Sequence, residues 1–354
     1  MKRHVVVVAT SARESGAWRI VTMLSDLAEA DHSTHYTFIT VRPLAMIKNN
    51  INIVVKINNI KDRCIFELFK IRKLLFVNGE PPDLVLSLNN IAILGALGIK
   101  QYVYIHQAFP FYPEHRWSIW NTERTQLFYQ KFYGLIMRIS IIMTNSKLIV
   151  QTKTMAERVQ KFWNKEAICW FPQVVRLQGL SRPPNSSMKS ILFYPATLHA
   201  HKNHQVLIRA IQAIKEINHL ICAKCLFVFT LNHLSDEDVQ SVECIKLVGT
   251  LSHEEILQHY LQASVLLFPS VIETVGLPLV EAAGLGLPII CADTEYSREI
   301  LSVYPGVTFL PEGDARAWAE AIINHVIDCS ENPIMKRFSS YSPNIRTTDL
   351  ADLE

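Results

Sequence analysis

Short apolar runs alternate along the chain with longer segments in which apolar residues recur every three or four positions. The short runs are typical of buried strands and the periodic segments of helices. In the first half we expect strands at 5–9, 37–41, 84–88, 102–105, 139–143 and 167–170, and helices at 17–29, 62–77, 91–97, 118–138 and 147–162. Strands that alternate with helices indicate βαβ units and a parallel sheet.

The same alternation continues after a break near residue 185. Strands are predicted at 191–194, 226–230, 245–248, 265–268, 288–291 and 307–310, and helices at 203–217, 253–263, 277–285, 295–301 and 314–327. The break is rich in Pro, Ser and Asn and has little to bury, as in a linker. The pattern predicts an α/β chain with two doubly wound domains, 1–180 and 190–330, a linker at 181–189 and a divergent tail at 331–354.

Composition narrows the class of protein. The 354 residues are 49% hydrophobic and 19% charged, which suits two folded domains, and the formal charge of +3 gives no reason to expect a nucleic-acid partner. The seven cysteines form no framework and are expected to be reduced thiols in a cytoplasmic protein. No stretch approaches the roughly 20 apolar residues of a membrane helix.

The segment with the most specific chemistry follows the strand at 265–268. Glu273 lies in the loop after this strand, Gly276 permits close backbone approach to a ligand, and Pro278 suits the first turn of a helix. That helix start offers N–H groups and a positive dipole end to an anion. Glu281 lies one turn inside the helix, where its carboxylate could bind a ribose diol. Alternatively, both glutamates are solvated surface residues. The combination of a loop, a glycine, a proline and a helix start at this point disfavours that alternative.

This segment resembles the two-glutamate motif of glycosyltransferase family 4, retaining enzymes with the GT-B fold. The resemblance extends over residues 191–310. It implies two Rossmann-like domains facing a cleft. It also implies that Glu273 contacts the donor sugar, that Glu281 binds the ribose, and that the backbone of Gly276 and Leu277 faces sugar and phosphate.

A second signature opens the second domain at residues 193–204. Lys202 stands at a strand-to-helix turn, where a cation can meet a diphosphate, although a solvated lysine is the alternative. The resemblance places a phosphate-binding Lys at Lys202, and Thr197 stands where many relatives carry an Arg. The local pattern resembles an O-antigen or mannosyltransferase-like branch, and one phosphate contact is in question at Thr197.

Further donor contacts are implied with less specific patterns. Gly249 and Leu251 lie in a loop that resembles the one holding the nucleotide base, and Gly16 stands where relatives have a glycine pair. His106 ends the strand at 102–105, where relatives often place a His that faces the donor sugar. A plain turn at Gly16 and a core histidine at His106 are equally good interpretations. The aromatic residues that follow could line an acceptor site or pack in the core: Phe109, Phe111, Tyr112, Trp117 and Trp120.

We expect no bound metal and no cofactor other than the nucleotide sugar itself. Cys222 and Cys225 have zinc-like spacing but no second pair, and the acidic run at 236–238 follows a helix-cap Ser. The segment 65–73 mixes apolar and basic residues and could lie on a membrane, but a helix packed on the sheet is the favoured interpretation.

The resemblance implies retaining transfer of a hexose from a GDP- or UDP-linked donor to a saccharide or polyprenyl-linked acceptor. Peripheral contact with the inner face of the membrane would accompany such an acceptor. Two alternatives stay open. One is a nucleotide-sugar epimerase on the same fold, and the other is a non-catalytic nucleotide-sugar-binding scaffold.

Overall fold

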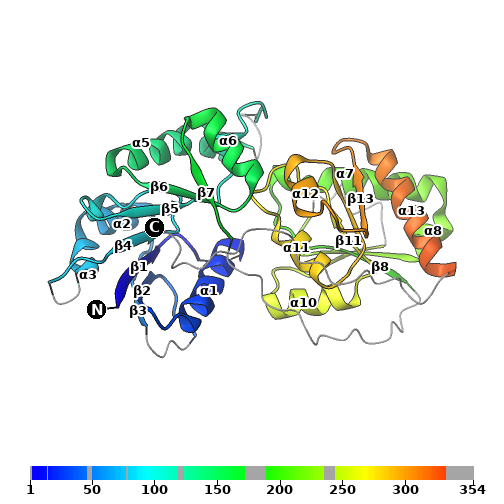
Figure 1. Ribbon diagram of the computed structural model, residues 1–354. Coiled ribbons are helices and arrows are strands. Elements are labelled where there is room, and N and C mark those ends of the chain that lie inside the picture. Colours follow the sequence, from blue (N-terminus) through cyan, green and yellow to red (C-terminus); the bar gives the residue numbers. More distant parts are fainter. Residues whose placement is uncertain are drawn as a thin grey trace. The chain divides into compact units, whose positions relative to one another are not determined.

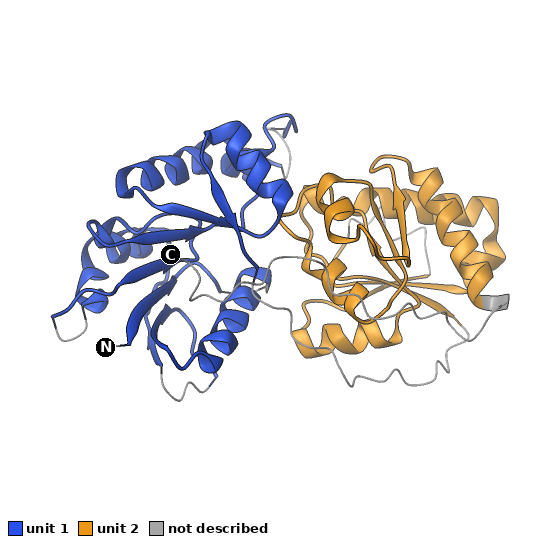
Figure 2. Ribbon diagram, in the orientation of Figure 1, with its two compact units in different colours: residues 1–175, 345–354 blue, residues 176–344 orange. Residues whose placement is uncertain are grey.

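The computed structural model describes residues 2–13, 15–45, 50–76, 79–118, 123–171, 189–234 and 244–331. These residues divide into two compact units, with the described residues up to 171 in unit 1 and those from 189 onward in unit 2 (Figure 2). The predicted linker up to residue 188, the acidic run at 236–238 and the tail from residue 332 lie outside the described residues.

Unit 1 contains one parallel sheet of seven strands in the order β3-β2-β1-β4-β5-β6-β7 (Figure 1). The strands are β1 (Arg3–Ala9), β2 (Thr34–Thr40), β3 (Ile51–Val54), β4 (Leu84–Ser87), β5 (Gln101–Tyr104), β6 (Lys147–Val150) and β7 (Ala167–Cys169). Residues 5–9 of β1 are all buried. Helices cover both faces of such a central strand, so its sequence is a continuous apolar run rather than an alternating one.

The helices of unit 1 connect these strands in order. They are α1 (Ser15–Ala30), α2 (Ile60–Ile65), η1 (Phe66–Lys70), α3 (Arg72–Leu75), η2 (Leu94–Ala96), η3 (Phe109–Phe111), α4 (Arg124–Phe128), η4 (Tyr129–Tyr133), α5 (Gly134–Thr144) and α6 (Lys153–Trp163). No helix among the described residues is long and apolar enough to span a bilayer.

Two predicted elements of unit 1 are wrong at the boundary between α5 and β6, and a further strand was missed. Residues 139–143 belong to α5 rather than to a strand, and residues 147–150 form β6 rather than the start of a helix. A short run rich in isoleucine fits a strand or a buried helix equally well by periodicity. Asn145 settles the boundary, because its left-handed conformation (φ 50°) ends α5 and lets β6 begin two residues later. The missed strand is β3.

Unit 2 contains a parallel sheet of six strands in the order β10-β9-β8-β11-β12-β13. All six predicted strands are present: β8 (Ser190–Tyr194), β9 (Cys225–Phe229), β10 (Ile245–Leu247), β11 (Val265–Phe268), β12 (Ile289–Ala292) and β13 (Val307–Leu310). The helices are η5 (Ala200–Lys202), α7 (His204–Ile217), α8 (His219–Ala223), α10 (His253–Gln262), α11 (Leu277–Gly284), α12 (Glu295–Ile300) and α13 (Ala315–Glu331). Of these, α8 was not predicted.

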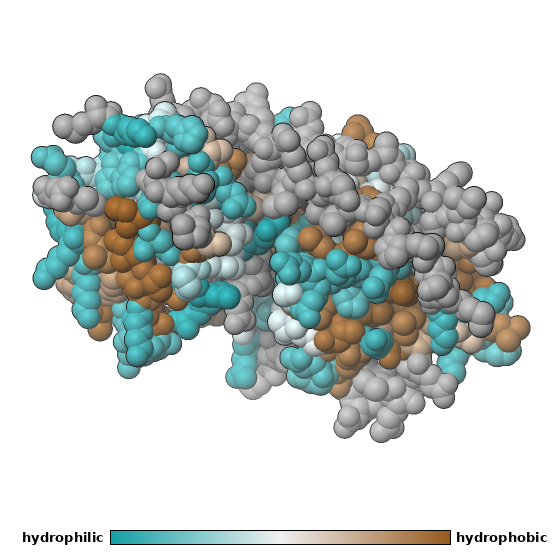
Figure 3. Space-filling view, turned by 90° about the horizontal axis from the view of Figure 1, so that it is seen from below, coloured by the Kyte–Doolittle hydropathy of each residue, from teal (hydrophilic) through white to brown (hydrophobic). Residues whose placement is uncertain are grey.

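The strand order reverses once in each sheet. In unit 1 the reversal lies between β1 and β4, and in unit 2 between β8 and β11. Ligands of doubly wound sheets bind outside the carboxyl ends of the strands at such a switch point. The loops after these four strands are therefore where a site is expected. Apolar residues are also exposed on the surface, and Figure 3 shows them as brown patches on the face that it draws.

Candidate functional site

Lys202 and Glu273 meet at the switch point of unit 2. Lys202 ends η5 after β8, Glu273 follows β11, and Lys202 Nζ forms an ion pair with Glu273 Oε1. The two side chains are 18% and 16% exposed. Ser270 Oγ donates a second hydrogen bond to Glu273 Oε1 at 2.7 Å. The sequence predicted both residues, but only the fold brings the two side chains together.

The charges of this pair are held by its surroundings. Burial alone would raise the pKa of Glu273, but the Lys202 ammonium, together with His201 and the hydrogen bond from Ser270, keeps that pKa below its usual value. Burial and the same ammonium lower the pKa of His201 to about 3 and also lower the pKa of His199. These two histidines are therefore neutral at neutral pH, and Lys202 supplies the positive charge of this loop.

Hydrogen bonds fix the loops that carry the pair. The backbone N–H of Val271 donates to the carbonyl of His201 at 2.9 Å. The Tyr194 hydroxyl donates to the carbonyl of Lys202 at 2.6 Å, and the Tyr296 hydroxyl to the carbonyl of Ser270 at 2.5 Å. Because both loops are tied to β8, α12 and each other, the pair is held before any ligand arrives.

Gly276 brings the chain into α11 beside this pair. Its left-handed conformation (φ 71°) is one that L side chains rarely adopt. A Cβ there would also lie 3.3 Å from side-chain atoms of Leu279 and Phe268. Leu277 and Pro278 then form the first turn of α11, with its positive dipole end after Glu273. Glycine is needed here for conformation and space.

Glu281 lies one turn into α11 and is 7% exposed. The Tyr260 hydroxyl donates to its Oε2 at 3.2 Å, and His253 Nδ1 lies 3.6 Å from its Oε1. Both neighbours belong to α10, so two helices set the direction of the carboxylate. A carboxylate held in this way suits the two hydroxyls of a ribose.

The remaining predicted residues of unit 2 lie in loops at strand ends. Gly249 and Leu251 lie between β10 and α10, and Gly249 has φ 73°. A Cβ on Gly249 would be 3.0 Å from Asn232 Oδ1, so the backbone passes close to that side chain. Thr197 is exposed in the loop between β8 and η5.

In unit 1, His106 follows β5 and is held by Asn90. The Asn90 amide oxygen accepts the backbone N–H of His106 at 2.7 Å, so its nitrogen faces His106 Nε2 at 3.0 Å. Burial lowers the pKa of His106 to about 4, so the ring is neutral and Nδ1 carries the proton. Buried Nδ1 has no hydrogen-bond partner among the described residues. Gly16 is exposed in the first turn of α1.

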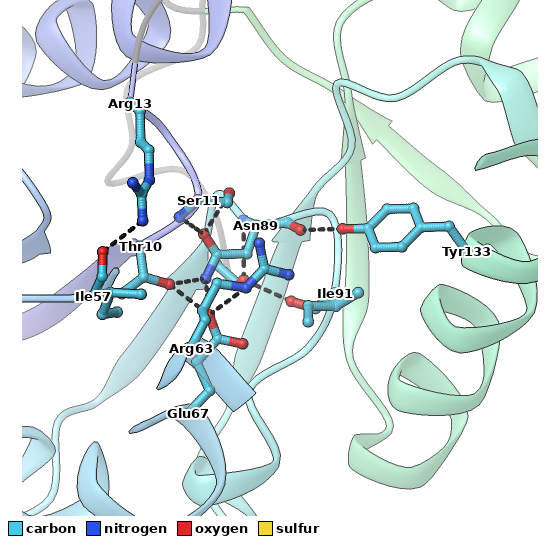
Figure 4. Close-up of polar contacts among 10 residues, drawn as sticks. Thr10, Ser11, Arg13, Ile57, Arg63, Glu67, Asn89, Ile91 and Tyr133 are labelled. Atoms are coloured by element: carbon cyan, nitrogen blue, oxygen red, sulfur yellow. Dashed lines mark hydrogen bonds and ion pairs between the residues drawn. The ribbon is translucent and has the colours of Figure 1, made fainter. Parts of the chain in front are cut away.

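A buried polar cluster that the sequence did not reveal occupies the switch point of unit 1 (Figure 4). Thr10 Oγ1 donates to Glu67 Oε1 at 2.5 Å, and Asn89 Nδ2 donates to the same oxygen at 2.9 Å. Arg63 Nε lies 3.4 Å from this oxygen, and the Tyr133 hydroxyl donates to the carbonyl of Asn89 at 2.9 Å. The cluster ties η1 and η4 to the ends of β1 and β4. In the sequence, this cluster is indicated only by the polar pair Asn89 and Asn90, which directly follows the predicted strand at 84–88.

Removing the Glu67 side chain should destabilise unit 1 far more than neutralising it. Glu67 is 5% exposed, so Glu67→Ala leaves two buried donors unpaired and should lower the free energy of unfolding by about 1–3 kcal/mol. Glu67→Gln keeps an acceptor and should cost less. Urea unfolding of both variants measures this, and equal losses would show that the charge itself is required.

The same variants give a pH test. Burial raises the pKa of Glu67 despite Arg63 and Thr10, so the folded chain holds this proton more tightly than the unfolded chain. This group therefore adds stability as pH falls from neutral through the raised pKa, and the contribution is lost as pH rises again. Glu67→Gln should remove that part of the pH dependence.

The aromatic residues after His106 pack in the interior of unit 1. Phe109, Phe111, Tyr112 and Trp117 are at most 8% exposed. Phe109 lies edge-on to Trp117, and Phe111 lies 4.5 Å from Trp163 between ring centres. These contacts favour the core interpretation for the four residues, while Trp120 lies outside the described residues.

The Cys222–Cys225 motif can be followed in the structure, whereas the acidic run at 236–238 lies outside the described residues. Cys222 and Cys225 are buried, and Cys222 Sγ lies 3.4 Å from Cys244 Sγ. Among the described residues, no group of three or more His, Cys, Asp or Glu side chains could hold a metal ion.

Comparison with known proteins adds to this geometry. Residues 189–328 match the family model described as Glycosyl transferases group 1. The amylovoran biosynthesis glycosyltransferase AmsK of Erwinia amylovora is 30% identical over 96 residues, which cover 25% of this chain and 23% of that protein. The alignment therefore spans less than a quarter of the relative's length.

The similarity to solved structures extends over most of the chain. WaaG, a glycosyltransferase involved in lipopolysaccharide biosynthesis, has a TM-score of 0.64 at 13% identity, over 93% of this chain and 95% of WaaG. HepE from Anabaena, in complex with UDP and glucose, has a TM-score of 0.62 at 13% identity, over 94% of this chain and 90% of HepE. At such identities the likeness shows the fold. The chain has the α/β GT-B fold of these glycosyltransferases, and its residues 189–328, less than half of the chain, match the Glycosyl transferases group 1 model.

Proposed function

We propose that the protein is a retaining glycosyltransferase. It moves a hexose, mannose-like, from a GDP- or UDP-linked donor to a saccharide or polyprenyl-linked saccharide in surface polysaccharide synthesis. The observation that carries the proposal is the partly buried Lys202–Glu273 pair at the switch point of unit 2, beside the start of α11. The family match of residues 189–328 supports the reaction class, and AmsK supports the polysaccharide context.

The residues suggest how the donor is held and activated. The diphosphate would meet the Lys202 ammonium and the N-terminus of α11, and both stabilise the charge that develops on the leaving group. Donor binding would draw the ammonium away from Glu273, whose carboxylate is then available to sugar hydroxyls. Glu281 would hold the ribose.

Transfer in a chelator tests the reaction and its independence from metal. In the proposed mechanism Lys202 and the α11 N-terminus supply the positive charge that a divalent ion would otherwise bring. Purified protein should therefore transfer sugar from a matched donor to its acceptor equally with and without EDTA. Loss of transfer in EDTA that added divalent metal restores would contradict the metal-free mechanism.

The same assay separates the two alternatives. An epimerase would convert the free donor to its epimer without any acceptor. A scaffold would bind the donor but would neither transfer nor hydrolyse it. The proposed enzyme gives a new glycosidic bond and free nucleoside diphosphate in equal amounts.

A further inference from the structure

The helix formed by α4, η4 and α5 exposes most of its large apolar residues. Its buried positions combine the polar or small residues Gln126, Gln130, Gly134 and Ser140 with only two large apolar ones, Met137 and Ile141. Its outward positions are large and apolar: Phe128, Phe132, Leu135, Ile136, Ile139, Ile142 and Met143, each between 48% and 63% exposed. A helix at the surface of a globular domain normally has the opposite arrangement, with its apolar stripe toward the core.

Specific contacts fix this helix with its apolar side outward. Gln130 Nε2 donates to the carbonyl of Tyr112 at 2.7 Å, and Ser140 Oγ accepts the backbone N–H of Ala92 at 3.0 Å. A Cβ on Gly134 would lie 2.8 Å from Pro110, so the helix packs closely at this point. Rotation that buried the phenylalanines would break these contacts. The fold therefore holds the outward apolar residues at the surface.

A neighbouring segment extends the surface. The turn η2 packs against α5 on one side and η1 on the other, and Leu97, which follows η2, is 47% exposed. On η1, Leu68 and Phe69 are 42% and 73% exposed. We call these residues, with the outward residues of α4–α5, the apolar face of unit 1. Leu68 and Phe69 lie in the segment that the sequence assigned to sheet packing. The structure shows that its Phe66 and Ile71 pack inward while these two residues face solvent.

The charged residues around the apolar face indicate what binds there. Residues 124–144 contain Arg124, Lys131 and Arg138, all exposed, and no Asp or Glu. Lys70, Arg72 and Lys73 are exposed on the neighbouring segment. Large apolar side chains flanked by basic ones are typical of a helix that lies in the interface of an anionic bilayer. A patch of this extent is unusual on a surface that stays in water.

We propose that the apolar face of unit 1 docks on the surface of a bilayer that contains anionic phospholipid. Phe132 and its neighbours enter the region between headgroups and acyl chains, while Lys131 and Arg138 contact the phosphates. Docking requires no nucleotide sugar and no transfer, so it holds or fails independently of the proposed reaction. It would bring unit 1 to any acceptor carried on a lipid.

Vesicle sedimentation tests the proposal with purified protein alone. Wild type should sediment with phosphatidylcholine vesicles that contain phosphatidylglycerol, and salt should weaken this binding. The double variant Phe132→Gln/Ile139→Gln should bind at least about tenfold more weakly. The matched control is Leu220→Gln/Val303→Gln, which alters two apolar residues of unit 2 that are 63% and 73% exposed and should bind as wild type.

A charge variant keeps the test decisive if the apolar variant misfolds. Lys131→Gln/Arg138→Gln should lose most of the preference for anionic over neutral vesicles, about fivefold per residue. Wild type that stays in the supernatant, or variants that bind as wild type, would overturn the proposal. Light scattering tests the alternative that a second copy of the chain covers this face. If wild type were a dimer that does not bind vesicles, and Phe132→Gln/Ile139→Gln were a monomer, the face would be a dimer interface.

Discussion

Replacing Lys202 with alanine should lower turnover by about 100-fold or more, as expected for loss of one strong contact to the charge that develops in the transition state. Lys202 is the cation of its loop, since His199 and His201 are neutral near pH 7 and Thr197 offers no charge. Steady-state transfer with saturating donor measures the effect. Lys215→Ala, at an exposed position on α7, is the matched control and should keep wild-type turnover.

Lys202→Ala also breaks the ion pair with Glu273, so a second variant is needed to separate the effect on stability from the effect on catalysis. Lys202→Ala leaves the partly buried Glu273 without its cation, and an unpaired charge in such a place destabilises a protein by itself. Lys202→Ala/Glu273→Gln removes that charge as well. If the loss reflects a missing phosphate contact, the double variant stays inactive although its stability recovers. Recovery of turnover in the double variant would assign Lys202 a structural role only.

Replacing Glu281 with alanine should weaken nucleoside diphosphate binding by about 1.5–3 kcal/mol, the range for hydrogen bonds to a charged group. The carboxylate is 7% exposed and directed by Tyr260 and His253, so it meets a ribose at little cost in ordering. Turnover at saturating donor should change less than affinity, since ribose contacts act in ground and transition state alike. Glu254→Ala, exposed in the first turn of α10, is the control. Unchanged affinity in Glu281→Ala would remove the ribose contact from the account.

The sequence anticipated unit 2 more fully than unit 1, for a physical reason. Most strands of unit 2 are short apolar runs with Pro or Gly close to one end. Helices α10 and α12 begin at the capping residues Ser252 and Thr294, whose side chains accept the N–H three residues on. These signals are local. Strand ends then place Lys202 and Glu273 at one edge without further information. Their ion pair joins positions 71 apart, and no local pattern could show it.

The parts that could not be predicted depend on tertiary contacts. Glu67 lies in a segment whose charges look solvated, and only the packing of η1 against β1 and β4 buries it. Residues 139–143 fit a strand by composition, but contacts of Gln130 and Ser140 hold their segment as a helix. The same contacts turn most of its large apolar residues outward, although periodicity alone would assign them to the core.

Calorimetric titration of the purified chain with UDP, GDP and their sugars tests the central claim most directly, namely that the switch point of unit 2 holds a nucleotide diphosphate sugar. We expect one nucleoside diphosphate and its sugar to bind with one-to-one stoichiometry, Lys202→Ala and Glu281→Ala each to weaken both, and Lys215→Ala to bind as wild type. Absence of binding to every nucleotide, or equal affinity in all four proteins, would contradict the claim.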